Sequence, residues 1–152
     1  MQIDDLVGPT RVVPKLKANS KRQALQELAR HAAELTGCDE KTIHRVLTER
    51  ERLGTTGIGQ GVAIPHGKLA GLPGIHGVFA RAATPIDFES VDDRPVDLFF
   101  LLLAPEDAGA AHLRALAQIS RLLRDSAFCN KLRGAAGEDA LHALLARQAA
   151  AA

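Results

Sequence analysis

Aromatic residues are rare in this sequence: it has no Trp and no Tyr, and five Phe bring the aromatic share of its 152 residues to 3%. Proteins that bind single strands of nucleic acid stack the bases on such side chains. An excess of one charge is also missing, since 19 Lys and Arg face 18 Asp and Glu. A nucleic-acid-binding domain normally carries a basic face. The composition therefore argues against a nucleic-acid partner.

Cysteine is scarce as well. Cys38 and Cys129 form no C-x-x-C pair, which is typical of reduced thiols in a cytoplasmic protein. The sequence has no H-E-x-x-H and no G-x-S-x-G motif, so neither that type of zinc site nor that type of serine hydrolase is predicted. We expect no metal and no cofactor. A nucleophilic pair of Cys129 with a histidine stays open, although a cysteine that follows Phe128 in a helix is more typical of core.

Hydrophobic runs long enough to cross a membrane are also lacking. The longest runs from Leu98 to Ala104, whereas a membrane-spanning helix needs about 20 apolar residues. The sequence MQIDD at the start has neither the basic beginning nor the apolar stretch of a signal peptide. We therefore expect a cytoplasmic protein with no membrane insertion.

What the sequence does contain is clear hydrophobic periodicity, at a length that suits a single domain over residues 1–152. Capping residues, apolar stripes and terminal glycines mark the helices, and a nearly continuous apolar run at 96–103 is typical of a strand buried on both faces. The order of elements predicts an α/β fold, with a mixed, mostly central β-sheet flanked by helices on both sides. The predicted strands are 10–13 (ended by Pro14), 62–64, 75–81, 85–88 and 96–103, and the predicted helices run from Ser20 to Gly37, from Asp39 to about Gly54, and over 110–124, 126–133 and 138–148, with a frayed tail from Ala149.

The glycine-rich segment GIGQGVAIPHGK, residues 57–68, raises the question of a nucleotide site. A P-loop has four residues between its glycines and ends in Lys-Ser or Lys-Thr. Here five residues separate Gly61 from Gly67, and Lys68 is followed by Leu69. A dinucleotide-binding loop opens a helix, but the residues after these glycines have the pattern of a strand. The glycines are better interpreted as tight turns before a strand.

His66 lies within that segment, between Pro65 and Gly67. Proline cannot donate to a sheet ladder, so it belongs at an edge or at a strand end. We expect His66 at the end of a short strand, presented at the rim, where Gly67 would let the backbone of another molecule approach. Functional residues are often held on loops by rigid elements. The alternative is a turn histidine bonded to the backbone, and the local sequence leaves both interpretations open.

Helical spacing selects two further residues. His112 lies in the first turn of the helix predicted at 110–124, on the face of Leu116, and a neutral histidine beside a phosphoryl group suits a helix N-terminus. Arg50 follows Ile43 by seven residues, so it falls on an apolar stripe and could direct a planar guanidinium inward at a phosphate. The alternatives are a packed histidine and an arginine that extends its head group into water at a helix end.

The remaining histidines are less informative. His31, His44 and His142 lie beside the apolar stripes of their helices, which predicts solvated surface. His76 falls in a predicted strand and its role is undecided.

A longer string, ERLGTTGIGQGVAIPHGK, resembles the active-site segment of the phosphotransferase-system enzyme IIA domains of the fructose–mannitol type. Similarity continues through residues 84–107 and 112–125, so it covers nearly the whole chain. Within the family the likeness is greatest to the nitrogen-regulatory enzyme IIA. The residues that match the signature are Glu51, Ile58, Gly59, Val62, Ala63, Ile64, Pro65, His66 and Gly67.

The resemblance implies a fold like that of the mannitol-specific enzyme IIA and a phosphohistidine at His66, formed at Nε2. It also implies His112 and Arg50 as supporting residues, with Gly67 and Gln60 at the binding surface; Gln60 stands where some mannitol-type relatives have an acidic residue. The donor would be an HPr-like phosphocarrier protein. The output would be phosphorylation-dependent regulation of a target protein, or, alternatively, transfer to a sugar-specific IIB domain. A binding module that takes no phosphate is a third alternative.

Overall fold

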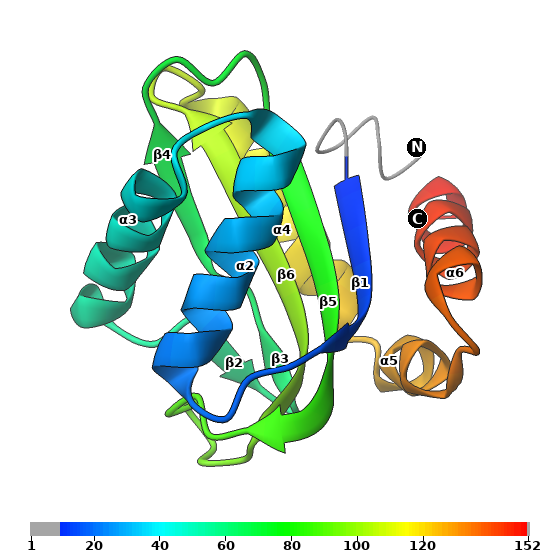
Figure 1. Cartoon of the computed structure of the whole chain (residues 1–152). Helices are drawn as coiled ribbons and strands as arrows, with labels where there is room; N and C mark the ends of the chain where they lie inside the picture. Colours follow the sequence, from blue (N-terminus) through cyan, green and yellow to red (C-terminus); the bar gives the residue numbers. More distant parts are fainter. Residues whose placement is uncertain (1–9, 152) are drawn as a thin grey trace.

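The structure, a computed structural model, describes residues 10–151 and the side chains of residues 10–146. These residues form a six-stranded sheet with helices on both faces (Figure 1). The strands are β1 (Thr10–Leu16), β2 (Gly57–Gly59), β3 (Val62–Ala63), β4 (His66–Leu69), β5 (His76–Ile86) and β6 (Val96–Pro105). The helices are α2 (Lys21–Thr36), α3 (Glu40–Leu53), α4 (Ala110–Leu123), α5 (Ser126–Gly134) and α6 (Glu138–Ala151).

The sheet is mixed, as predicted, and β6 is its central strand. The strand order is β1-β5-β6-β3-β2, and β4 also pairs with β6. β6 is antiparallel to β5 and parallel to β3 and β4. All residues from Leu98 to Leu102 are fully buried. This confirms the prediction of a strand covered on both faces, because alternate side chains of one strand point to opposite sides of the sheet.

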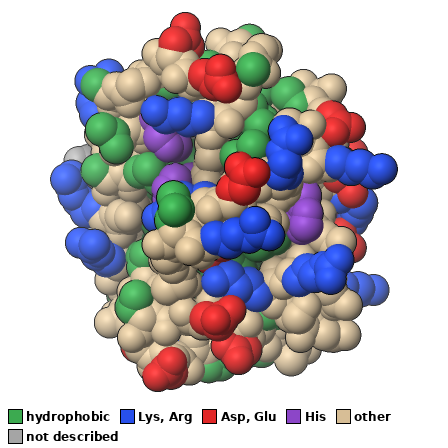
Figure 2. Space-filling model, turned by 90° about the vertical axis from the view of Figure 1, so that its left-hand side faces the viewer, with side chains coloured by type: hydrophobic (Ala, Val, Ile, Leu, Met, Phe, Trp, Pro, Cys, Tyr) green, Lys and Arg blue, Asp and Glu red, His purple; other side chains and the backbone are tan. Residues whose placement is uncertain are grey.

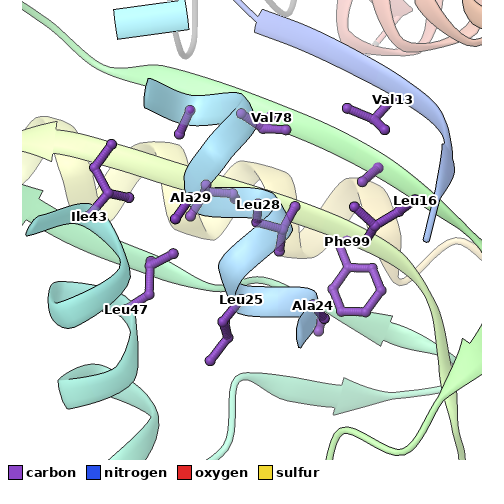
Figure 3. Packing of buried hydrophobic residues seen from close by; sticks show 14 of the residues in the cluster. Val13, Leu16, Ala24, Leu25, Leu28, Ala29, Ile43, Leu47, Val78 and Phe99 are labelled. Atoms are coloured by element: carbon purple, nitrogen blue, oxygen red, sulfur yellow. The ribbon is translucent and has the colours of Figure 1, made fainter. Parts of the chain in front are cut away.

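Two hydrophobic cores follow from that alternation. On one face, Phe99 packs with residues of α2 and α3, including Leu28 and Ile43 (Figure 3). On the other face, Phe100 packs with residues of α4, α5 and α6, including Ile119. The helices on both sides therefore hold the sheet through apolar burial, the dominant stabilising contribution in such a fold.

The starts of α2 and α3 and the end of α2 agree with the signals in the sequence. The Ser20 side chain accepts from the backbone N–H of Gln23 at 3.2 Å, and Gly37 ends α2 in the left-handed region with φ of 76°. Asp39 caps α3 by accepting from the backbone N–H of Thr42. Each cap satisfies a backbone group that the helix itself leaves unpaired.

The predicted elements need correction in four places, three in the strands and one at a helix end. The first strand does not end at Pro14 but runs to Leu16, with a register shift that accommodates the missing proline N–H. The predicted strands at 75–81 and 85–88 form one strand, β5, again with a register shift. The short strands β2 and β4 were not predicted, because three or four residues rich in glycine carry no periodic signal. Helix α6 is three residues longer than predicted and reaches Ala151. Over the described part of the chain, the helices are too short or too polar for any of them to span a bilayer.

Candidate active site

His66 is the first residue of β4 and is half-buried. We predicted that His66 follows the end of the strand at 62–64. Instead, that strand (β3) ends at Ala63, and two residues later His66 begins a new strand, β4. Pro65 has no N–H to donate, but its carbonyl accepts from the backbone N–H of Leu102 in β6 at 3.0 Å. The central strand therefore fixes the backbone immediately before the histidine.

Both nitrogens of the His66 ring have a partner. Nδ1 lies 2.9 Å from the carbonyl oxygen of Ile64, and the Nε–H of Arg50 donates to Nε2 at 3.2 Å. A carbonyl only accepts, so the ring proton belongs on Nδ1, and Nε2 carries the lone pair. The local backbone and Arg50 together select the tautomer in which Nε2 is the nucleophilic nitrogen.

The environment of His66 favours the neutral ring. Burial is the main cause that lowers the pKa of His66, and the Arg50 cation lowers it further. The Ile64 carbonyl and the Glu51 carboxylate oppose this, but the pKa stays below the ordinary histidine value. Desolvation and a nearby cation both disfavour a protonated imidazole. A neutral ring keeps its lone pair available for nucleophilic attack.

Arg50 is held at the end of α3 by two hydrogen bonds. Besides the bond from Nε to His66, its Nη1 donates to the carbonyl oxygen of Gly54 at 2.9 Å. The second bond satisfies a carbonyl just beyond the helix, where α3 can no longer do so. Of the two interpretations of Arg50 from the sequence, the structure favours the inward one.

His112 lies beside His66, with the ring centroids 5.8 Å apart. It is only 5% exposed, and its Nδ1 is buried without a hydrogen-bond partner. Burial is the main cause that lowers its pKa, followed by His66 and Lys68. No side chain caps α4 at Gly109, although the N–H of Ala111 in the first turn donates to the carbonyl of Ala108 at 3.1 Å. A neutral histidine and a helix N-terminus thus meet at one place, which suits an anion.

Gly67 and Gln60 each have a structural role in addition to the binding role expected of them. A Cβ on Gly67 would overlap Cγ1 of Val46, so the glycine is explained by the close packing of α3 on β4. Gln60 has a φ of 57° and holds a turn: its N–H donates to Asp92 at 2.9 Å, and its carbonyl accepts from Arg133 at 2.9 Å. Gln60 does not line the cavity at His66.

The cavity that contains His66 has a volume of about 300 Å³ and lies between the end of α3 and the middle of α4. Figure 2 shows the α3 side of the molecule, where histidine side chains reach the surface among Lys, Arg and hydrophobic side chains. A larger cleft of about 1000 Å³ lies between α2 and α3, but His66 does not line it, and His112 lines neither of the two. The lining of the smaller cavity is Arg50, Thr55, Thr56, Ile58, Ile64, His66, Leu116, Ala117 and Ser120.

The other candidate residues lie outside this site. His31 and His44 are half-buried, each with one unpartnered buried ring nitrogen, so the prediction of solvated surface was wrong for both, while His142 is exposed. His76 bonds through Nδ1 to the carbonyl of Gly74 at 3.0 Å. Cys129 is buried, and burial raises the pKa of its thiol, which disfavours the reactive thiolate. Over residues 10–146, no three His, Cys, Asp or Glu side chains are grouped to hold a metal ion.

Sequence reasoning missed Thr55 and Thr56, and it noted Glu51 only as part of a motif. Thr55 and Thr56 line the cavity, and Thr56 is only 5% exposed. Glu51 accepts hydrogen bonds from Thr56. One feature of the sequence could have indicated these contacts. Glu51 is a carboxylate in the last turn of a helix, where the helix dipole disfavours an anion, so it needs donors from elsewhere.

Comparison with known proteins identifies the family of this chain. Residues 6–148 match the model of the protein family described as phosphoenolpyruvate-dependent sugar phosphotransferase system, EIIA 2. The chain belongs to this family. It is 60% identical over 146 residues to a protein of Bradyrhizobium diazoefficiens named nitrogen regulatory protein, covering 96% of this chain and 95% of that protein. Proteins of the EIIA family act as phosphoryl carriers.

Solved structures of the family have the same fold. The nitrogen regulatory protein IIA-Ntr from Neisseria meningitidis superposes with a TM-score of 0.86 at 31% identity, over 94% of this chain and 98% of that one. The mannitol IIA of Escherichia coli gives a TM-score of 0.73 at 21% identity, over 90% and 96% of the two chains. At that identity the second match shows the fold alone.

Proposed function

We propose that this EIIA-family protein is a phosphocarrier whose His66 accepts a phosphoryl group at Nε2 from a phosphohistidine of an HPr-like protein, and that it works as a phosphorylation-dependent regulator. The observation that carries the proposal is the pairing of the two ring nitrogens. The Ile64 carbonyl accepts a hydrogen bond from Nδ1–H, so Nε2 keeps its lone pair beside the cavity. Such a nucleophile needs neither a metal nor a nucleotide, because the P–N bond of the donor is already activated.

In the proposed step, the Nε2 lone pair attacks the phosphorus of the donor. A new P–N bond forms at His66 as the donor P–N bond breaks, and the electron pair of that bond returns to the donor ring. If the donor ring carries a proton on its second nitrogen, it leaves as neutral imidazole and no proton has to move. The His66 ring then holds positive charge at its Nδ1–H, which the Ile64 carbonyl stabilises.

Arg50 and His112 are proposed to stabilise the charge in transit. Arg50 now donates to Nε2, so its Nε–H must turn to a phosphoryl oxygen as the phosphorus arrives. His112 and the first turn of α4 would contact the other oxygens. Catalysis of phosphoryl transfer is mostly positioning plus stabilisation of charge on those oxygens. The backbone beside Gly67 is a further candidate donor. Gln60, whose backbone is bonded to Asp92 and Arg133, would contact the partner protein and not the phosphoryl group.

The destination of the phosphate separates regulation from transport. Regulation is favoured by the relatives named nitrogen regulatory protein, which match nearly the full length of the chain. Transfer to a sugar-specific IIB domain is the second candidate, because the mannitol enzyme shares the fold. A regulator would bind a target protein differently in its two charge states, at the expected location in the cytoplasm. Transport would be favoured if an isolated IIB domain accepts the phosphate rapidly and every target protein binds the phosphorylated and unphosphorylated forms with equal affinity.

The decisive experiment is an acceptor assay. The protein is incubated with phosphoenolpyruvate, enzyme I and an HPr-like carrier, and its intact mass is measured. We expect one acid-labile phosphate on the wild type and none on His66→Ala. His76→Ala is the matched control, since His76 has the same Nδ1-to-carbonyl bond but lies outside the cavity. A wild type that takes no phosphate from any such donor would favour the binding module instead.

A further inference from the structure

Glu51 is a buried carboxylate next to the proposed active site. Its side chain is only 5% exposed. It lies in the last turn of α3, between Arg50 and Arg52, where the helix dipole works against an anion. The helix itself therefore gains nothing from this charge, and its role must come from the contacts that it makes.

Three donors converge on the Glu51 carboxylate. Lys21, the first residue of α2, places its ammonium nitrogen 2.8 Å from Oε2. The backbone N–H of Thr56 points at both oxygens, at 3.1 and 3.2 Å, and the Thr56 hydroxyl donates to Oε1. Lys21 also lies 4.9 Å from the centre of the Phe88 ring. The carboxylate thus joins the end of α3, the start of α2 and the turn that follows α3.

The turn at 54–56 is connected by hydrogen bonds to both ring nitrogens of His66. On one side, the carbonyl of Thr56 accepts from the N–H of Ile64 at 2.9 Å, and the carbonyl of Ile64 pairs with Nδ1 of His66. On the other side, the carbonyl of Gly54 holds Nη1 of Arg50, whose Nε reaches Nε2 of His66. A continuous set of hydrogen bonds therefore runs from the turn at 54–56 to each side of the imidazole.

We propose that Glu51 is a positioning residue for phosphoryl transfer: its carboxylate fixes the turn at 54–56, and through this turn it aligns Arg50 and the His66 ring. This rests on the proposed function of His66. Glu51 lines the neighbouring cleft and not the cavity at His66, so it acts without touching the phosphoryl group.

Removal of the charge would loosen this arrangement. Glu51→Gln leaves the ammonium of Lys21, which is 19% exposed, with only the distant Glu89 carboxylate at 3.9 Å. It also turns one of the two oxygens that Thr56 uses into a donor. A small displacement of positioning groups can slow an enzymatic step by up to about 10²-fold. Glu49→Gln is the matched control, because Glu49 is an exposed carboxylate on the same helix.

The test is a double-mutant cycle on the single-turnover rate of phosphate uptake, with Glu51→Gln and Arg50→Lys alone and combined. We expect Glu51→Gln to slow uptake about 10- to 100-fold in the wild-type background, and several-fold less when Arg50 is already Lys, because the two act as one unit. Glu49→Gln should match the wild type. If Glu51→Gln folds poorly in a urea titration, Thr56→Val removes only the hydroxyl donor and should slow uptake in the same direction.

Two outcomes would overturn the proposal. One is a wild-type rate for Glu51→Gln, and the other is an equal fold-change in both Arg50 backgrounds, which would indicate general destabilisation. A second readout needs no phosphate: NMR titration should show a lower pKa for His66 in Glu51→Gln, since an anion is lost and the Lys21 cation remains. A wild type that takes no phosphate would refute the function of His66, whereas a wild type that takes phosphate no faster than Glu51→Gln would refute the role of Glu51.

Discussion

The Nε–H of Arg50 donates to Nε2 of His66 at 3.2 Å, so the guanidinium occupies the lone pair that the proposed reaction uses. In the unphosphorylated site, the Arg50 N–H therefore stands where the phosphorus atom would bind. As the phosphoryl group arrives, the same N–H can move to one of its oxygens while Nη1 keeps its bond to Gly54. Arg50 is then preorganised for the product as well as for the resting state.

Arg50→Lys should slow phosphorylation of His66, because the point charge of an ammonium cannot reproduce the planar fork of a guanidinium. Loss of one preorganised donor costs about 10²–10³ in rate in a dry site, and this half-open cavity should show a decrease at or below that range. Rapid-quench measurement on the folded variant gives the value. Arg52→Lys, an exposed position on the same helix, serves as the control. A wild-type rate for Arg50→Lys would leave Arg50 as a helix-end residue only.

The low pKa of His66 predicts the pH dependence. Burial, helped by Arg50, lowers its pKa below 6.5, so the neutral ring prevails at pH 7 and protonation begins only at more acidic pH. NMR titration of the histidine ring signals should show the midpoints of His66 and His112 below 6.5. A His66 midpoint at or above 6.5 would mean that the ring is more solvated, or more closely paired with an anion, than the structure shows.

The same shift sets a stability trend. A histidine whose folded-state pKa lies below its unfolded value takes up protons more readily when unfolded. The free energy of unfolding should therefore fall as the pH is lowered from about 7 through the unfolded pKa of about 6.5, until the folded-state pKa is passed. The paired variant His66→Gln with His112→Gln should lose part of this dependence in urea titrations. An equal dependence in both proteins would assign the trend to other groups.

Helical periodicity predicted which way two of the residues near His66 face. Arg50 follows Ile43 by two helical turns, and His112 precedes Leu116 by about one turn, so both had to face the sheet if the helices packed on it. His66 was marked by its neighbours in the sequence. The two cores and the central strand followed from the same local patterns, and for these the structure agrees with the prediction.

Contacts between distant segments were not predictable. The partner of Glu51 is Lys21, thirty positions away on another helix, and no local pattern connects them. Strand β4 depends on pairing with β6 and not on the propensity of its own residues. The packing requirement at Gly67 was not predictable for the same reason, because Val46 comes close to it only once α3 lies on β4.

Gly67→Ala tests that packing. The new methyl group would overlap Cγ1 of Val46, and the stiff valine side chain has little room to turn away. Overpacking of this kind costs about 1–3 kcal/mol of unfolding free energy. Val46→Ala should restore part of this loss when it is combined with Gly67→Ala. Urea titrations of the four proteins give the comparison, and simple addition of the two losses would show that the methyl groups do not meet.

His112→Ala should slow phosphorylation of His66 without preventing it at long times, since His112 stabilises charge and is not the acceptor. The decrease should lie at or below about 10²-fold, the lower end of the range for loss of one preorganised donor. His142→Ala, at an exposed position of α6, controls for loss of a histidine. A rate equal to wild type would return His112 to a packing role beneath the site.

The nitrogen proposed to carry the phosphate is Nε2 of His66, and NMR of the phosphorylated protein with ¹⁵N-labelled histidine identifies it directly. We expect that one nitrogen is coupled to phosphorus, that this nitrogen is Nε2 of His66, and that Nδ1 of the same ring stays protonated toward Ile64. Phosphorus coupled to Nδ1 of His66, or to either nitrogen of His112, would contradict it.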